Sequence, residues 1–469
     1  MPKPRLHIVL GDQLDIASTL FDGFDDAADF IWMGETVAEA THVWCHKLRL
    51  AFFFSAMRHF RDELRRQGRT VHYRQIDDPQ PTTDFTEALV ADARATGAAG
   101  LVVVEPGDHR VRHMLETAAA ELEISLEVRV DSHFYDSVED FRSFAKGRKT
   151  LILENYYRQL RKRHGILMEA DGKPAGGEWN YDKQNRETFG KRAPIDVPAM
   201  PKYPLDTISK RVIETVEESF ADHPGRLGHF DMPVERQDAL DYLDDFIKHR
   251  LPDFGRFQDA MWEGQRFLYH SRLSALLNVK LLNPREVIEA AVSAYRTGAA
   301  PLNSVEGFVR QILGWREFVR GVYFLEGEDY LHRNELGAHE PLPSFFWDGE
   351  TEMACIRDAM ANVIDHGYAH HIQRLMVLGL FSLLLGADPR EFHDWHMAMY
   401  LDAVDWVSAP NTIGMSQHAD GGIVGTKPYC ASGNYIAKMS NHCSGCRFNP
   451  KLATGEDACP FTTLYWDFL

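Results

Sequence analysis

Three cysteines near the C-terminal end have the spacing of metal ligands. Two residues separate Cys443 from Cys446, and twelve more separate Cys446 from Cys459. Thiolates at such loop-like spacing are typical of zinc and iron–sulfur sites. A disulfide is the alternative, but six cysteines in 469 residues make no disulfide scaffold and favour a reducing compartment. We therefore expect a metal site with a fourth ligand from elsewhere in the chain.

Two adjacent histidines form a second candidate site. His370 and His371 cannot share one face of a helix, so they are a poor zinc pair. One of them could face a cavity as a proton donor while the other packs. Arg374 lies one helical turn after His370 and favours a functional role. The alternative is a pair of structural histidines.

Carboxylates and amides farther along could orient a planar ligand. Asp402 and Asp405 are three residues apart and can point the same way, and Asn411 follows them. A carboxylate and an amide opposite a heterocycle are typical of a buried cofactor site. Glu306 and Arg310 could form a polar wall for the same purpose. Helix ends and structural ion pairs are the alternative interpretations.

Hydroxyl groups follow His270 at a predicted helix start. Ser271 and Ser274 could hold a phosphate together with the backbone N–H groups there. Ordinary helix capping is the simpler interpretation of these serines.

Residues 1–135 alternate short apolar strands with helical patterns, which predicts a parallel, doubly wound sheet. The predicted strands are Leu6–Leu10, Asp29–Met33, Val71–Gln75, Gly100–Val104 and Leu126–Val130. Asp12 follows the first strand, and Glu35 and Glu39 follow the second. The carboxyl edge of such a sheet is where ligands bind, although surface solvation would also explain these acids.

Residues 136–235 are predicted to be a connector, partly irregular, that begins with a basic stretch. Eight basic residues and one acid lie between positions 142 and 163, with aromatic residues interleaved. The basic residues are Arg142, Lys146, Arg148, Lys149, Arg158, Arg161, Lys162 and Arg163. The stretch could bind nucleic acid, or it could be the solvated face of a helix.

Residues 236–469 show helical spacing of apolar residues throughout, so we expect an all-α domain. The clearest helical patterns are Val287–Tyr295, Val305–Tyr323, Cys355–His366, Ile372–Leu385 and Glu391–Trp406.

The composition sets limits on the class of protein. A formal charge of −18 argues against nucleic-acid binding over the whole surface, but binding depends on the local patch. No run of 18 apolar residues is present, so we expect no membrane span. The N-terminal apolar stretch is too short for a signal peptide. A cytoplasmic monomer is the expectation.

The order of these parts resembles photolyases and cryptochromes. Ser271–Ser274 is similar to the flavin-phosphate motif of that superfamily, and Trp315–Phe318 resembles its W-R-E-F segment. The closest resemblance is to the iron–sulfur bacterial cryptochrome/photolyase family, which includes prokaryotic (6-4) photolyases. The segments that carry it are Leu10–Leu14, Phe54–Phe60, Glu105–Gly107, Ala369–Met376, Gly425–Tyr429 and the three cysteines.

The resemblance implies three cofactors and their residues. A four-iron four-sulfur cluster would be held by Cys355, Cys443, Cys446 and Cys459, although spacing alone does not exclude zinc. FAD would bind in the helical domain near His270, Ser271, Leu273, Ser274, Glu306, Arg310, Asp402, Asp405 and Asn411. A 6,7-dimethyl-8-ribityllumazine antenna would bind near Asp12, Glu35, Glu39 and Phe53.

The resemblance also implies light-driven electron transfer from reduced FAD to a (6-4) photoproduct in UV-damaged DNA. His371 matches the proton donor, with His370, Tyr429 and Met415 as neighbours. Trp395 and Trp347 match the electron-transfer residues. His396 departs from the family, where a tyrosine is expected, and histidine is the poorer one-electron donor.

Three functions follow, in order of preference. The first is (6-4) DNA photolyase, a lyase. The second is a cryptochrome-type blue-light receptor with the same cofactors and little repair. The third is a light-independent, zinc-stabilised nucleic-acid binder.

Overall fold

The N-terminal part is a parallel sheet, as the strand–helix alternation predicts. The computed structural model describes residues 4–79 and 83–469. The strands run in the order β3-β2-β1-β4-β5, and every neighbouring pair is parallel. Their bounds are β1 Leu6–Ile8, β2 Phe30–Gly34, β3 Val71–Arg74, β4 Gly100–Val104 and β5 Ser125–Arg129.

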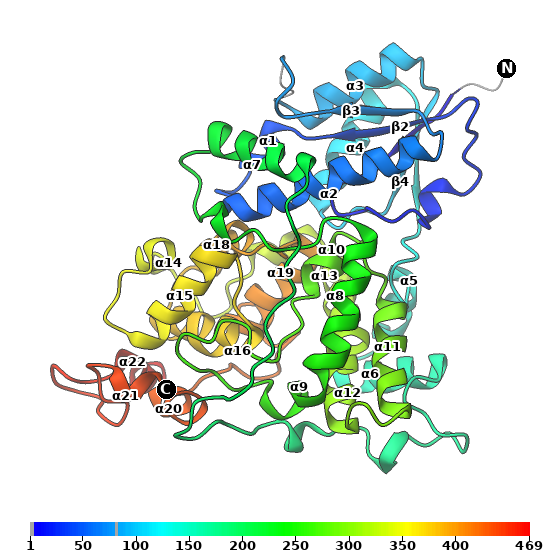
Figure 1. Ribbon diagram of the computed structural model, residues 1–469. Coiled ribbons are helices and arrows are strands. Elements are labelled where there is room, and N and C mark those ends of the chain that lie inside the picture. Colours follow the sequence, from blue (N-terminus) through cyan, green and yellow to red (C-terminus); the bar gives the residue numbers. More distant parts are fainter. Residues whose placement is uncertain (1–3, 80–82) are drawn as a thin grey trace.

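The two faces of the sheet belong to different apolar cores. On β4, Leu101 and Val103 pack with α3 (Phe85–Thr96) and α4 (His109–Leu122) in a small core of their own. Val102 and Val104 point the other way, because successive side chains of a strand alternate. That second face packs on α2 (Lys47–Arg66) and joins the core of the helical half (Figure 1).

The helices of the connector pack against both halves of the chain. α5 (Val138–Ala145) packs against α13 (Glu317–Glu326), and α6 (Leu153–His164) packs against the helical half as well. α7 (Thr207–Ser219) lies beside α2 (Figure 1). Between α6 and α7 the chain is irregular apart from short 3-10 turns, as predicted from its composition.

The remainder is helical. In chain order, its first helices are α8 Arg236–His249, α9 Leu251–Phe257, α10 Ser274–Asn278, α11 Pro284–Arg296, α12 Leu302–Val309 and α13 Glu317–Glu326. They are followed by α14 Phe345–Asp348, α15 Ala354–His366, α16 His371–Gln373, α17 Leu380–Leu385, α18 Pro389–Met399 and α19 Asp405–Ala409. The last three are α20 Gly433–Met439, α21 His442–Gly445 and α22 Pro460–Phe468.

Three π-helical segments interrupt this helical part. They are η5 (Arg310–Arg316), η7 (Arg374–Gly379) and η8 (Pro410–Ser416). Such wide turns frequently occur at functional sites, where they redirect side chains. Each of the three contributes residues to the central cavity.

The single helix predicted over Glu391–Trp406 is wrong. α18 ends at Met399, Tyr400 is extended (φ −98°, ψ 133°), and α19 starts at Asp405. Other segments bind the intervening backbone. The Asn278 side chain donates to the Asp402 carbonyl at 2.7 Å, and Arg49 donates to the Ala403 carbonyl at 3.1 Å. These bonds replace the helical ones that the sequence pattern implied.

No helix within the described residues is long and apolar enough to cross a membrane.

Candidate functional site

A central cavity of about 350 Å³ lies within the helical half, between α10, the three π-helical segments and α18. Its lining brings together most of the residues that the sequence singled out. Those on the wall are His270, Ser271, Leu273, Ser274, His370, His371, His396, Asp402, Asn411 and Met415.

A strained turn presents the serine motif to the cavity. Leu268 and Arg272 have φ values of 46° and 56°, in the left-handed region that costs energy for residues other than glycine. The buried Arg272 makes two hydrogen bonds of 2.9 Å to Asp231, which fix the turn. Ser271 and Leu273 therefore reach the cavity wall from either side of Arg272.

Asp402 is the centre of a polar group on the cavity wall. Its carboxylate accepts hydrogen bonds from the Ser274 hydroxyl at 2.6 Å and from Arg374 at 3.0 and 3.2 Å. The Arg374 guanidinium also lies over the Tyr400 ring, 3.9 Å from its centroid. The arginine noted beside the histidines thus holds the predicted cofactor carboxylate in place.

Three of the four histidines on the wall, His270, His370 and His371, have different surroundings. His270 and His370 are buried and stacked, with ring centroids 4.3 Å apart. Both ring nitrogens of His370 lack a hydrogen-bond partner within the described part of the chain. His371 is surrounded by protein but projects into the cavity, where its side chain is accessible. Burial, with the nearby charge of Arg374, lowers the pKa of His371 to about 4, so its imidazole is neutral at pH 7.

Arg316 supplies a buried positive charge at the same wall. Its Nε and Nη1 atoms have no hydrogen-bond partner among the described residues. Burial lowers the pKa of Arg316 to about 10, which still leaves it charged at pH 7. A buried cation with free donors on a cavity wall is suited to an anionic ligand.

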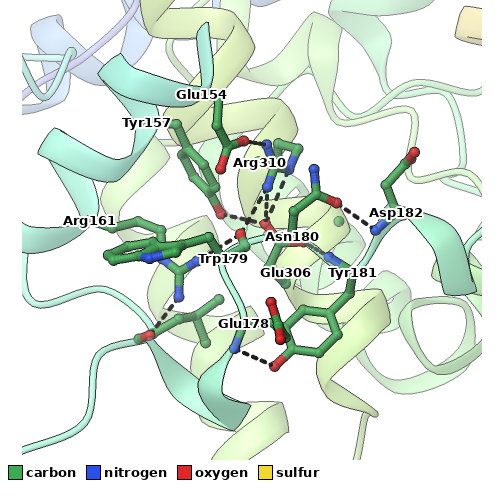
Figure 2. A network of polar contacts seen from close by, with 12 residues as sticks. Glu154, Tyr157, Arg161, Glu178, Trp179, Asn180, Tyr181, Asp182, Glu306 and Arg310 are labelled. Atoms are coloured by element: carbon green, nitrogen blue, oxygen red, sulfur yellow. Dashed lines mark hydrogen bonds and ion pairs between the residues drawn. The ribbon is translucent and has the colours of Figure 1, made fainter. Parts of the chain in front are cut away.

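Glu306 and Arg310 do not line the central cavity. They lie in a separate network that Figure 2 shows. Arg310 donates to Glu306 at 3.1 Å, to Glu154 at 2.5 Å and to the Trp179 carbonyl at 2.9 Å. Tyr157 donates its hydroxyl proton to Glu306 at 3.1 Å. The Glu306–Arg310 pair therefore joins the irregular connector to the helical half. It is a structural ion pair, which was the alternative interpretation of these two residues in the sequence.

A second cavity, the interdomain cavity, lies between the carboxyl edge of the sheet and α18–α19. Its volume is about 170 Å³, and the predicted antenna residues Asp12, Glu35, Glu39 and Phe53 all line it. Asp405 lines this cavity and not the central one, because α19 carries it toward the sheet.

The carboxylates of the interdomain cavity differ in how many hydrogen bonds they already form within the protein. Glu35 is saturated: Arg58 donates twice at 2.8 Å, Tyr73 at 2.6 Å and the Ile76 N–H at 3.0 Å. Glu39 forms a paired contact with Arg110. Burial raises the pKa of Asp12 to about 6, since Lys280 offsets that burial only in part. Asp12 is the acid that retains binding capacity toward the cavity.

One line of contacts joins the two cavities. Asp405 lies 3.3 Å from Nε2 of the buried His393, and Nδ1 of that ring lies 2.9 Å from the Thr412 hydroxyl. Thr412 lines the central cavity, whereas Asp405 lines the interdomain cavity.

Of the residues expected in electron transfer, only His396 is among the described residues that line the central cavity. Trp395 is fully buried behind the wall and donates its indole N–H to the Phe346 carbonyl at 2.6 Å. Trp347 directly follows Phe346 in the chain. Its ring centroid lies 5.3 Å from that of Trp44, which is 45% exposed. His396 stands on the wall itself, with its ring centroid 4.4 Å from that of Tyr400.

Tyr429 lies at the rim and not on the wall of the central cavity. It is 39% exposed, in the segment that follows Met415. A Cβ at Gly425 would lie 3.6 Å from the Tyr429 ring and 3.8 Å from the Met415 Cα. Tyr429 and Met415 are therefore both close to one glycine, at the edge of the cavity.

Four cysteines meet at one small site, and all of them are free thiols. Cys355, Cys443, Cys446 and Cys459 line a pocket of about 10 Å³ between α15, α21 and the start of α22. Burial, and then the neighbouring sulfurs, raise the pKa of the Cys355 thiol. Among the described residues, no group of three or more His, Cys, Asp or Glu side chains has the geometry for a metal ion. Cys355 and Cys459 are buried and Cys443 and Cys446 are half-buried, so the four unpaired thiols form the all-sulfur donor set that iron–sulfur clusters use.

Some wall residues gave no sequence signal. Asn278 and Gln258 are isolated amides with no motif around them, yet both line the cavity. Tyr368 and Phe392 look like ordinary core aromatics in the sequence. Arg316 belongs to the W-R-E-F segment noted in the sequence. The spacing of the two arginines did not indicate that Arg316, and not Arg310, lines the cavity.

Comparisons with known proteins agree with this architecture. Residues 7–232 match the family described as deoxyribodipyrimidine photo-lyase-related protein. A (6-4) photolyase of Agrobacterium fabrum is 46% identical over 465 residues, which cover 99% of this chain and 91% of the relative.

Two solved structures share the fold. A bacterial class III photolyase from Agrobacterium tumefaciens superposes with a TM-score of 0.61 at 15% identity, covering 94% of this chain and 87% of the other. A Synechocystis cryptochrome superposes with a TM-score of 0.59 at 14% identity, covering 94% and 89%. At such identities the likeness shows the fold alone.

Proposed function

Because the chain belongs to the iron–sulfur bacterial cryptochrome/photolyase family, we propose that it repairs (6-4) pyrimidine photoproducts in DNA with light. The observation that carries the proposal is the placement of His371. Its imidazole projects into the central cavity, beside the stacked His270–His370 pair and Met415. This chain therefore presents a proton-carrying group inside a cavity, beneath the rim that holds Tyr429.

The central cavity suits FAD. Arg316 offers free donors to an anionic group, and Ser271 and Asn411 add polar contacts on the wall. Asp402 is held by Arg374 and Ser274, so its carboxylate has a fixed position for a ring N–H. Reduced FAD, when bound, would supply the electron that light transfers to the lesion.

His371 would act on the lesion as a proton donor. A photoproduct must leave the duplex to reach a cavity, as bases do in other DNA-modifying enzymes. Proton donation requires the imidazolium form of His371, and an anionic group in the cavity would raise its pKa toward neutrality and so populate that form. His370, the adjacent residue, is buried and stacks on the ring of His270.

The other two sites take the remaining cofactors in this proposal. The interdomain cavity would hold the ribityllumazine antenna, with Asp12 as its available carboxyl group. The four cysteines would hold a four-iron four-sulfur cluster, which clamps the C-terminal helices to α15. Iron and acid-labile sulfide analysis would separate this cluster from zinc, which would give neither.

Illumination of pre-reduced protein with a (6-4)-containing oligonucleotide tests the function. We expect the absorbance of intact thymine to return in the light and not in the dark. If FAD is bound and no thymine is restored, the repair proposal is wrong and the photoreceptor function takes its place. A colourless protein that contains zinc would exclude both and support the light-independent nucleic-acid binder.

A further inference from the structure

Two tryptophan rings meet at the surface of the protein. Trp44 lies in the turn before α2 and is 45% exposed, and Trp347 lies on α14 and is half-buried. Their ring centroids are 5.3 Å apart and the ring planes are inclined by 46°, so the two indoles are in contact. Trp44 lines neither the central nor the interdomain cavity. Trp347 is among the residues expected in electron transfer, whereas Trp44 is not.

One hydrogen bond continues this pair into the interior. The indole N–H of Trp395 donates to the Phe346 carbonyl at 2.6 Å, and that carbonyl belongs to the peptide group that joins Phe346 to Trp347. On its other side, the Trp395 ring stacks on Phe392, with centroids 5.6 Å apart, and Phe392 lines the central cavity. Trp395 is therefore connected to the cavity wall at one end and to Trp347 at the other.

The turn that carries Trp44 is held against the helix that carries Trp395. The His46 N–H donates to the Ala398 carbonyl at 2.8 Å, three residues beyond Trp395 on α18. Cys45, which lies between Trp44 and His46, is 1% exposed. The exposed indole therefore belongs to a turn that is anchored in the core.

Exposure makes Trp44 the most favourable place for positive charge in this series. Removal of one electron from an indole leaves a cation, and a cation is costly to bury away from water. Trp395 has no exposed surface, whereas nearly half of the Trp44 surface meets solvent. The free energy of an electron vacancy that forms on Trp395 therefore falls as the vacancy moves through Trp347 to Trp44.

We propose that Trp44 is the terminal electron donor in the photoreduction of a flavin in the central cavity. The inference rests on the proposed function, which supplies the FAD, and adds to it a residue at the surface. When Trp395 gives one electron to the cavity, Trp347 replaces that electron, and Trp44 in turn replaces the electron of Trp347.

Trp44 is restored from solvent. The oxidised indole releases its N–H proton to water and becomes a neutral radical. A soluble thiol then transfers one hydrogen atom to this radical, and two thiyl radicals combine as a disulfide. Each cycle therefore delivers one electron to the cavity and one proton to water, and both come from the thiol.

The test is time-resolved absorption of the tryptophan radical in illuminated holoprotein without DNA, at increasing concentrations of dithiothreitol. In the wild type the radical should decay faster as the thiol concentration rises, because the vacancy reaches solvent. Trp44→Phe should lose most of this dependence, because phenylalanine is not oxidised and the vacancy stays on the more buried indoles. Trp44→Tyr should restore it as a phenoxyl radical, because an exposed phenol can also give up an electron and release its proton to water.

The control is Trp466→Phe, which removes an indole on α22 that is 63% exposed and contacts Tyr465. Its radical should decay as in the wild type. Wild-type thiol dependence in Trp44→Phe overturns the proposal. A loss that Trp44→Tyr does not restore overturns it as well, because packing against Trp347 would then explain the effect. Bound flavin without repair of DNA would refute the proposed function alone, and the radical would still report on Trp44.

Discussion

At the scale of single residues, the chemistry depends on His371. Substitution of His371 by Ala should lower (6-4) repair by about 100-fold or more, because general acid catalysis contributes about 10² to 10⁴. The side chain projects into an open cavity, so the protein should fold and retain FAD. Repair kinetics and the flavin-to-protein absorbance ratio measure the two effects.

The matched control is His270→Asn, which changes a neighbouring wall residue and leaves His371 in place. It should reduce repair much less than His371→Ala does. Full repair by the His371 variant would remove the proton-donor role from this residue.

His396 gives a second prediction at this scale. Histidine is the poorer one-electron donor, and it occupies the wall position in contact with Tyr400, directly after Trp395 in the chain. His396→Tyr should therefore speed the photoreduction of bound flavin in the presence of a thiol, measured by bleaching of the flavin absorbance. Trp395→Phe should slow it. Equal rates in wild type and the tyrosine variant would show that electrons take another path.

At the scale of elements, the cysteine site joins α15 to the last three helices. Cys355 is buried on α15, whereas Cys443, Cys446 and Cys459 flank α21 and the start of α22. Cys355→Ala should lose the bound iron, because it removes the thiolate that α15 supplies and leaves only three ligands for the cluster. Iron content and the visible absorption of the cluster would measure the loss.

Cys430→Ala is the control for that substitution. Cys430 is half-buried, lies between Tyr429 and α20 in the chain, and does not line the cysteine pocket. It should keep a full complement of iron. Retention of iron by the Cys355 variant, with loss in the Cys430 variant, would reverse the assignment of the fourth ligand.

The elements also show what the sequence could predict. The five strands were predictable because a parallel sheet buries both faces and leaves short apolar runs. The break at Tyr400 was not, since its cause is hydrogen bonding by Asn278 and Arg49, far away in the chain. The sequence also did not show that Arg316 lines the central cavity whereas Arg310 does not. The π-helical segment between them changes the direction in which its side chains point, and the apolar pattern gives no sign of it.

At the scale of the whole molecule, buried histidines make stability depend on pH. Burial lowers the pKa of His46 to about 4 from its ordinary value of 6.5. Between these values the unfolded chain binds more protons than the folded chain, so stability is lost as the pH falls below 6.5. At pH 5 the contribution of His46 is a loss of about 2 kcal/mol.

We therefore expect the melting temperature to fall between pH 7 and pH 5, as measured by circular dichroism. His46→Asn should weaken this dependence, because asparagine does not titrate and can still accept the Leu48 N–H bond that His46 accepts at 3.0 Å. A variant with the wild-type pH profile would show that other groups dominate.

The core shared by the two halves has a consequence for folding. The apolar cluster that begins at Val9 and Val102 on the sheet continues through α2 to Phe461 near the C-terminus. A fragment that ends at residue 135 would keep α2 on the sheet but would expose to water the part of α2 that packs against α7. The N-terminal sheet therefore depends on the rest of the chain for part of its burial, despite its self-contained strand order. We therefore expect the sheet and the helical half to unfold together, because they share one apolar core.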